Sequence, residues 1–145
     1  MRSLELAMAA IPDRAMKIYG GEPFSEALRM LAEEDKERTS PDWLAARLEN
    51  MLLTNGVRLT QMRALRKEAS ELLKRYRQMP DADPLTVSSF ELSGILTLNG
   101  QIRQLEENED RFRQLLQVVR DAKKQRRQIT LLQALERIGG PVDGA

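Results

Sequence analysis

The sequence predicts an all-α protein: a long antiparallel helical hairpin, similar to a coiled coil, with short N-terminal helices and a C-terminal amphipathic helix. The composition favours helices, because aromatic residues make up only 4% of the chain and charged residues 31%. Two long stretches repeat apolar residues at alternate spacings of three and four, as the helices of coiled coils do. Between them, residues 80–84 read Pro-Asp-Ala-Asp-Pro, which is a turn sequence.

The chain of 145 residues is expected to form a single domain. Its expected parts are N-terminal helices in 1–39, the helical hairpin in 40–127 with its turn at 80–84, a C-terminal helix in 128–139 and a frayed tail in 140–145. Two short helices are expected at about 3–10 and 12–19, because Pro12 cannot sit inside a helix without the loss of a hydrogen bond. Residues 23–38 then carry apolar side chains at helical spacing, which predicts a further amphipathic helix.

The first arm of the hairpin begins at Ser40, which can cap a helix whose first residues are Pro41 and Asp42. Positions that alternate by four and three residues form the first stripe: Leu44, Leu48, Met51, Asn55, Arg58, Met62, Leu65, Ala69, Leu72, Tyr76 and Met79. Nine of these eleven positions are apolar or amphipathic. A heptad pattern of this length predicts a helix that packs along a partner helix.

The second arm begins with Asp83 as a cap and Pro84 as the first helical residue. Its apolar positions form the second stripe: Ile95, Leu98, Ile102, Leu105, Glu109, Phe112, Leu116 and Val119. The two arms also carry opposite charge, since residues 41–79 hold 8 basic and 4 acidic groups and residues 80–119 hold 3 and 7. Opposite charges of this kind predict arms that complement each other.

If the chain doubles back at Ala82, residues at equal distances on either side of it face each other. Leu72 is then expected opposite Leu92, and Leu48 opposite Leu116. The same rule places Asn55 opposite Glu109, with Arg58 about one turn away, so both stripes become polar at the same height. We hypothesise a buried or half-buried polar layer of Asn55, Arg58 and Glu109 that fixes the register of the helices. The alternative is that this layer binds a ligand or an ion.

Further apolar residues lie off the two stripes: Leu52, Leu53, Val57, Leu59, Leu73, Leu96, Leu115 and Val118. Two helices bury only one stripe each, so other chain segments must cover these side chains. The N-terminal helices can cover some of them. Another copy of the chain, or another protein, is expected to cover the rest, which predicts a homo-oligomer or a hetero-complex.

A basic stretch follows the second stripe, and its charged side chains are Arg120, Lys123, Lys124, Arg126 and Arg127. One interpretation is a solvated helical segment. The other is a site for nucleic acid or an acidic partner. No aromatic residue interrupts the stretch, so nucleic acid would be held through its phosphates and without sequence specificity.

The C-terminal helix repeats apolar residues at Ile129, Leu132, Leu135 and Ile138, which predicts an amphipathic docking helix. Such a helix can fold back on the hairpin or insert into a neighbouring protein.

The chain contains no Cys and no His, which excludes disulfides, Ser-His-Asp triads and the usual zinc sites. It also has no nucleotide-binding glycine motif, and we expect no enzyme, no cofactor and no metal. The acidic cluster at 106–110 is explained by pairing with Arg111 and Arg113 along a helix. No stretch is long and apolar enough to span a membrane, so we expect synthesis in the cytoplasm.

Residues 65–102, LRKEASELLKRYRQMPDADPLTVSSFELSGILTLNGQI, resemble the helical hairpins of type III secretion needle and inner-rod subunits. Those subunits also join two helices by a turn rich in Pro, Asp and Asn. The resemblance covers about a quarter of the chain, which continues well beyond the usual end of those subunits. It implies a bacterial subunit of an assembled machine.

Together these observations predict a non-enzymatic helical interaction protein. We expect it to be a structural or adaptor subunit of a larger assembly, of the secretion or phage type. The alternative is a small helical protein that binds nucleic-acid backbones through the basic stretch at 120–127.

Overall fold

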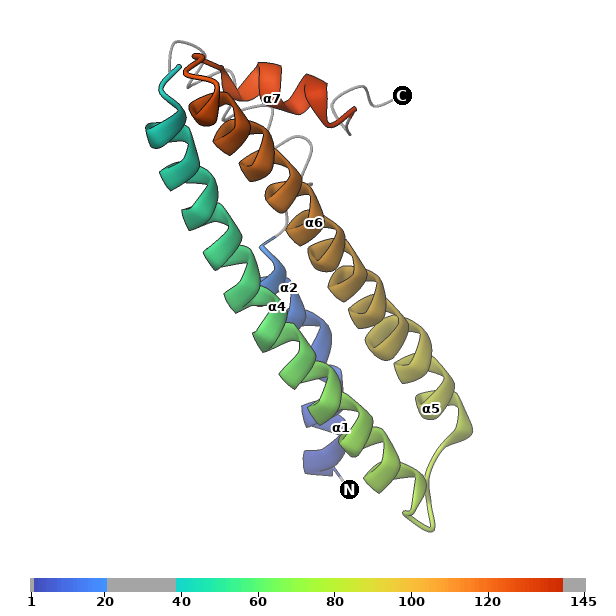
Figure 1. Cartoon of the computed structure of the whole chain (residues 1–145). Coiled ribbons are helices and arrows are strands. Elements are labelled where there is room, and N and C mark those ends of the chain that lie inside the picture. The colour runs from blue at the N-terminus through green and yellow to red at the C-terminus, as the bar shows by residue number, and fades with distance from the viewer. Residues whose placement is uncertain (1, 21–38, 140–145) are drawn as a thin grey trace. The chain divides into compact units, whose positions relative to one another are not determined.

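The computed structural model describes residues 2–20 and 39–139, and their secondary structure is helical, with no strand (Figure 1). This confirms the predicted fold class for the described residues. The elements are α1 (Arg2–Ala9), α2 (Ile11–Tyr19), α4 (Pro41–Arg77), α5 (Pro84–Phe90), the π-helix η1 (Glu91–Leu96), α6 (Thr97–Lys124) and α7 (Leu131–Arg137). The helix predicted at 23–38 and the tail at 140–145 lie outside the described residues.

The chain divides into two compact units. Unit 1 consists of Met1–Gly21 and Val57–Glu106, and unit 2 consists of Glu22–Gly56 and Glu107–Ala145. Helices α4 and α6 each contribute residues to both units, because each of them runs without a break across a unit boundary. The prediction of a single domain therefore stays a prediction.

In unit 1, the N-terminal helices form at the predicted places. Pro12 lies in the first turn of α2, where its missing N–H costs nothing. Gly20 ends α2 with a φ of 90°, a left-handed conformation that favours glycine, and its N–H donates to the carbonyl of Met16 at 3.0 Å. Both helices bury apolar side chains in the core of unit 1: Leu4, Met8, Ile11 and Ala15.

The turn of the hairpin lies in unit 1, between the end of α4 at Arg77 and the start of α5 at Pro84 (Figure 1). As predicted, Asp83 caps the second arm, and its carboxylate accepts the N–H of Leu85 at 3.0 Å. The core between the two arms comes from both predicted stripes: Met62, Leu65, Ala69, Leu72, Tyr76, Leu98, Ile102 and Leu105 are all buried.

One predicted pair in unit 1 is wrong. Leu72 is buried, but Leu92 is exposed, and the buried residues nearest to it along the chain are Phe90 and Gly94. The reason is η1, since a π-helix takes more residues per turn than an α-helix and so rotates the preceding residues relative to those that follow. A count that assumes unbroken heptads therefore places Leu92 on the wrong face.

In unit 2, α4 begins as predicted, with Ser40 accepting the N–H of Trp43 at 3.4 Å and Pro41 as the first helical residue. Arg47 lies over the ring of Trp43, 5.5 Å from its centroid, in cation–π geometry. The core of this unit contains both Leu48 and Leu116, as the hairpin predicted. Its other buried members are Leu44, Phe112, Leu115, Val119, Ala122, Ile129, Leu131, Ala134 and Leu135.

Ion pairs join the arms within each unit. The pairs of unit 1 follow the predicted charges, with the basic residue on the first arm, whereas in unit 2 the first arm supplies the acidic residue. In unit 1, Arg77 pairs with Glu91 at 2.5 Å, and a second pair joins Arg63 to Glu106 at 2.9 Å. In unit 2, Arg120 pairs with Glu49 at 3.3 Å and Lys123 with Asp42 at 2.6 Å. These side chains are about half exposed or more, so each pair contributes only about 0–1 kcal/mol to stability.

Candidate interaction surfaces

The predicted polar layer is only partly buried. In unit 2, Asn55 is buried and Glu109 is half-buried, with 31% of its side chain exposed and an ion pair to Arg113 at 3.4 Å. Asn108, the neighbour of Glu109, is also buried. The residue pattern did not single out Asn108, because a polar residue beside a polar stripe position gives no periodic signal.

Arg58 differs from its predicted place. It belongs to unit 1 and is exposed, so it forms no part of a buried layer. Its guanidinium lies over Gly20, where an added Cβ would come within 3.4 Å of the Arg58 Cζ. The reason is helical phase, since Leu59 rather than Arg58 is the buried residue at this level of α4.

The basic stretch begins in the last turns of α6 and continues beyond its end at Lys124, and all five of its predicted side chains are exposed. Two of them, Arg120 and Lys123, form ion pairs with carboxylates of α4. The other three, Lys124, Arg126 and Arg127, make no ion pair with another described residue. The part of the stretch that is left for an external anion is therefore smaller than the sequence suggested.

The backbone at the end of α6 has an unusual conformation. Arg126 has a φ of 56°, and it is the one residue other than glycine with a positive φ among the described residues. The N–H of Arg127 donates to the carbonyl of Ala122 at 2.8 Å, and that of Arg126 to Lys123 at 3.0 Å. This pair of bonds is a Schellman motif, in which the left-handed position is usually glycine.

The predicted docking helix folds back on its own unit. Its N-terminus is fixed by a capping box, in which the Thr130 hydroxyl accepts the N–H of Gln133 and the Gln133 side chain accepts the N–H of Thr130. Of its four predicted apolar positions, Ile129 and Leu135 are buried in unit 2, Ile138 is half-buried and Leu132 is exposed. The predicted apolar face did not include Leu131 and Ala134, which are buried, whereas it included the exposed Leu132.

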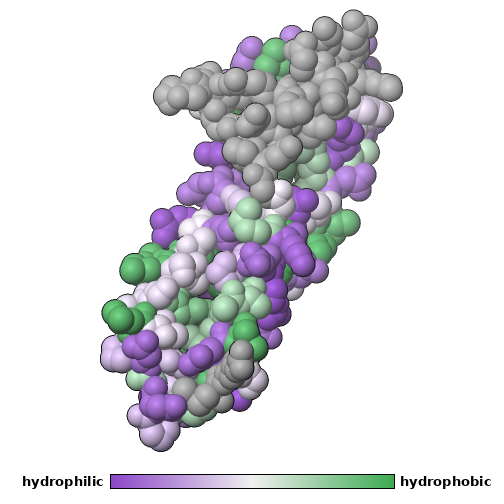
Figure 2. Space-filling view, turned by 180° about the vertical axis from the view of Figure 1, so that it is seen from behind, coloured by the Kyte–Doolittle hydropathy of each residue, from purple (hydrophilic) through white to green (hydrophobic). Residues whose placement is uncertain are grey.

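The apolar residues off the stripes have mixed positions. Leu59, Leu73 and Leu115 are buried, Leu52 and Val118 are half-buried, and Leu53, Val57 and Leu96 are exposed. Other large apolar residues join the exposed set, and Figure 2 shows such side chains interrupting the hydrophilic surface. In unit 1, Leu85, Leu92 and Leu96 are exposed by 77%, 65% and 58%.

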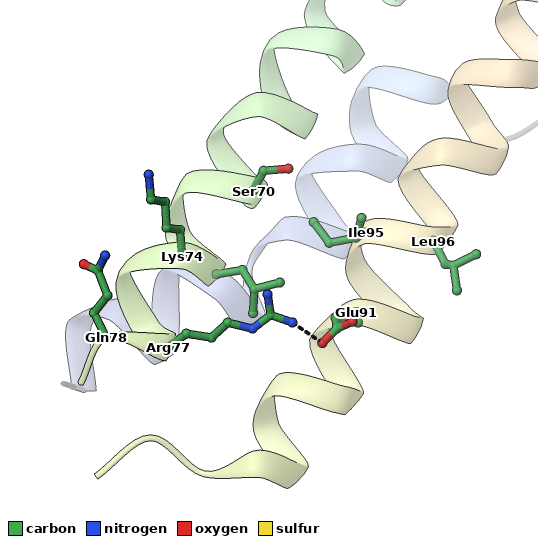
Figure 3. Close-up of a pocket in the computed structure, with 8 residues that line it drawn as sticks. Ser70, Lys74, Arg77, Gln78, Glu91, Ile95 and Leu96 are labelled. Carbon is green, nitrogen blue, oxygen red and sulfur yellow. Dashed lines mark hydrogen bonds and ion pairs between the residues drawn. The ribbon is translucent and has the colours of Figure 1, made fainter. Parts of the chain in front are cut away.

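Unit 1 also carries a groove between the two arms of the hairpin. Its volume is about 560 Å³, and more of its lining is apolar than polar. Helix α4 contributes Ser70, Leu73 and Lys74, and η1 contributes Ile95 and Leu96 (Figure 3). At one end, the ion pair between Arg77 and Glu91 bridges the two arms (Figure 3).

The described residues contain neither a candidate metal site nor a candidate membrane span. Within 2–20 and 39–139, no group of three or more His, Cys, Asp or Glu side chains is placed to hold a metal ion. No helix in these ranges is long and apolar enough to cross a membrane. Burial raises the pKa of the Tyr19 phenol above its ordinary value of 10.0.

Comparison with known proteins gave no match to a family model, to a curated protein or to a solved structure.

Proposed function

We propose that this chain is a non-enzymatic helical interaction protein, a structural or adaptor subunit of a larger protein assembly. The observation that carries the proposal is the row of exposed leucines on the second arm of unit 1, Leu85, Leu92 and Leu96. Leu85 belongs to α5, and Leu92 and Leu96 belong to η1, so all three lie within 12 residues of the same arm. Rows of exposed apolar side chains mark surfaces that another protein covers.

The kind of assembly we propose is a secretion-type or phage-type machine. The support is the resemblance of residues 65–102 to needle and inner-rod hairpins, together with an antiparallel helical hairpin in unit 1. Subunits of such machines work by packing against neighbours, and they need no catalytic residues.

The native mass of the purified chain and of its complex from source cells tests the proposal. We expect either an oligomer larger than the 16.6 kDa chain or a stoichiometric complex with an identified protein. Light scattering after size exclusion measures the first, and mass spectrometry of the co-purified band identifies the second. A strict monomer with no co-purifying protein would contradict the proposal.

A variant of the exposed leucines tests whether they form the interface of the complex. Replacement of Leu85, Leu92 and Leu96 by Ser should dissociate the complex and leave the helix content unchanged, because these side chains are exposed in the free chain. The matched control is Leu53→Ser, which changes an exposed leucine of unit 2 and should leave the complex intact.

Binding to nucleic-acid backbones is the second candidate function. It is favoured by the cluster of Lys124, Arg126 and Arg127, which are exposed and make no ion pair with other described residues. Retention on a DNA or RNA column that falls steeply with salt, and that Arg126→Glu with Arg127→Glu abolishes, would support this function. Retention that these changes leave intact would exclude this cluster as the site.

A further inference from the structure

The wall of the groove that α4 forms is basic. Three side chains of α4 that face the same way, Lys67, Ser70 and Lys74, follow one another at intervals of three and four residues. Ser70 and Lys74 line the groove directly, and Lys67 continues the same face one turn further on. Neither lysine forms an ion pair with another described residue.

The remaining basic groups on this face of α4 are only partly neutralised. Arg63 and Arg77 pair with Glu106 and Glu91 of the opposite arm. Arg66, by contrast, donates to the amide oxygen of Asn99 at 3.5 Å, and that oxygen bears no formal charge. Arg66, Lys67 and Lys74 therefore form no ion pair with a carboxylate of the described residues, and of the three Lys74 lines the groove.

The opposite wall of the groove comes from η1, which contributes two apolar side chains and Glu91, whose carboxylate pairs with Arg77. Ile95 and Leu96 both belong to η1, and Leu96 stays 58% exposed. Leu73 of α4, which is buried, lies between the two walls. Single π-helical turns inside α-helices often mark functional sites, because they are less stable than a regular helix and persist where they position side chains.

We propose that this groove binds an amphipathic helix of a partner protein, with leucine-type side chains on one face and carboxylates beside them. The apolar face would lie over Leu73, Ile95 and Leu96, and the carboxylates would pair with Lys67 and Lys74. Helix-in-groove binding uses this combination of an apolar floor and charged rims. The proposal rests on the proposed function, since it names the kind of partner that an assembly subunit takes.

A designed peptide tests the groove directly. The probe is a helical peptide of about 18 residues, long enough to hold a helix, with Leu on one face and Glu along its flanks. A companion peptide carries Lys in place of every Glu. We expect the acidic peptide to bind the full chain in a fluorescence anisotropy titration, more weakly as salt rises, and at least tenfold more tightly than the basic peptide. Equal binding of the two peptides would overturn the proposal.

Two neighbouring residues provide a matched pair of variants. Lys74→Glu should weaken binding of the acidic peptide by about tenfold, because it reverses a charge that lines the groove. Arg75→Glu makes the same change one residue later on α4, away from the groove lining, and should leave binding within about twofold. Equal losses in the two variants would show attraction to the net charge of the chain, which contradicts a groove site.

The apolar contact has its own variant, Leu96→Gln, which should weaken binding without loss of helix content because Leu96 is exposed. A second copy of the chain is the competing occupant. If Lys74→Glu dissociates an oligomer of the purified chain and the acidic peptide does not bind, the groove belongs to a self-interface and the proposal is wrong.

The two proposals fail in different ways. A stable complex from source cells that Lys74→Glu and Leu96→Gln leave intact would overturn the groove proposal and keep the proposed function. A monomer without partners that nevertheless binds the acidic peptide would overturn the proposed function and keep the groove.

Discussion

The phenol of Tyr76 lies where the turn of the hairpin meets the core of unit 1. Its side chain is fully buried, and its hydroxyl accepts the N–H of Asp83 at 2.9 Å. The ring thus fills the last level of the core, while the hydroxyl satisfies a backbone donor in the turn. The first stripe predicted a packed Tyr76, but nothing in the sequence indicated its bond to the turn.

Tyr76→Phe should lower the free energy of unfolding by about 1 kcal/mol, because it leaves the N–H of Asp83 without its acceptor. Chemical denaturation followed by circular dichroism measures the change. Tyr19→Phe is the matched control, since no hydrogen bond joins the Tyr19 hydroxyl to another described residue. It should stay within about 0.5 kcal/mol of the parent chain. A neutral Tyr76→Phe would show that water replaces the phenol in the turn.

Arg126 occupies a left-handed position that a residue with a Cβ adopts at a cost of roughly 1–2 kcal/mol. Arg126→Gly should therefore stabilise the chain by about 1 kcal/mol, since the Schellman bonds need the conformation and not the side chain. Thermal unfolding measures the gain. Arg127→Gly is the control, because Arg127 does not have a positive φ and its replacement relieves no strain. A loss of stability in Arg126→Gly would show that the guanidinium makes contacts that outweigh the backbone strain.

At the scale of the element, the π-helix η1 is built around a close contact between Gly94 and Phe90. A Cβ added to Gly94 would lie 2.9 Å from Cε1 of the buried Phe90 ring, closer than packed atoms approach. By contrast, Gly100 lies in α6 with nothing within 4 Å of its added Cβ. The two glycines, six residues apart, therefore have opposite structural roles.

Gly94→Ala should destabilise the chain by about 1–3 kcal/mol, because the Phe90 ring must move within a packed core. Gly100→Ala should instead stabilise it by about 0.5–1 kcal/mol through helix propensity alone. Urea denaturation of both variants measures the difference. If Gly94→Ala proves neutral or stabilising, the Phe90 ring is free to move and the close contact does not contribute to stability.

Heptad counting predicted the stripes of α4 and α6 well, since buried apolar side chains repeat at fixed helical spacing. It failed at Leu92, because it assumed an unbroken α-helix and local propensity does not reveal a π-helical turn. The buried face of α7 also differs from the predicted one, which included Leu132 and not Leu131. Its capping box fixes the helix start at Thr130, which turns Leu131 inward and Leu132 outward.

At the scale of the whole molecule, the sequence identified charged stretches but not which charges stay unpaired. Arg120 and Lys123 were predicted as contacts for nucleic acid or an acidic partner, yet both pair with α4. Lys67 and Lys74, to which we assign the partner's carboxylates, were not among the predicted contacts, because their significance depends on the opposite arm. Net charge along a chain does not show how ion pairs distribute across a fold.

Whether the two units form a single domain can be tested by asking whether they unfold in one transition. Leu65 is buried in the core of unit 1 and Leu115 in that of unit 2, so truncation of either to Ala should cost about 2–5 kcal/mol. Because α4 and α6 are shared, we expect one unfolding transition that either substitution shifts to lower denaturant.

Far-ultraviolet circular dichroism follows the helices of both units, and the fluorescence of Trp43 follows unit 2, where this residue packs. A comparison of the two signals shows whether the units unfold together. In a cooperative molecule the two signals change at the same denaturant concentration in the parent and in both variants. If Leu65→Ala shifts part of the dichroism transition and leaves the Trp43 transition in place, the units unfold separately. The shared helices would then fray between them, and the single-domain prediction would be wrong.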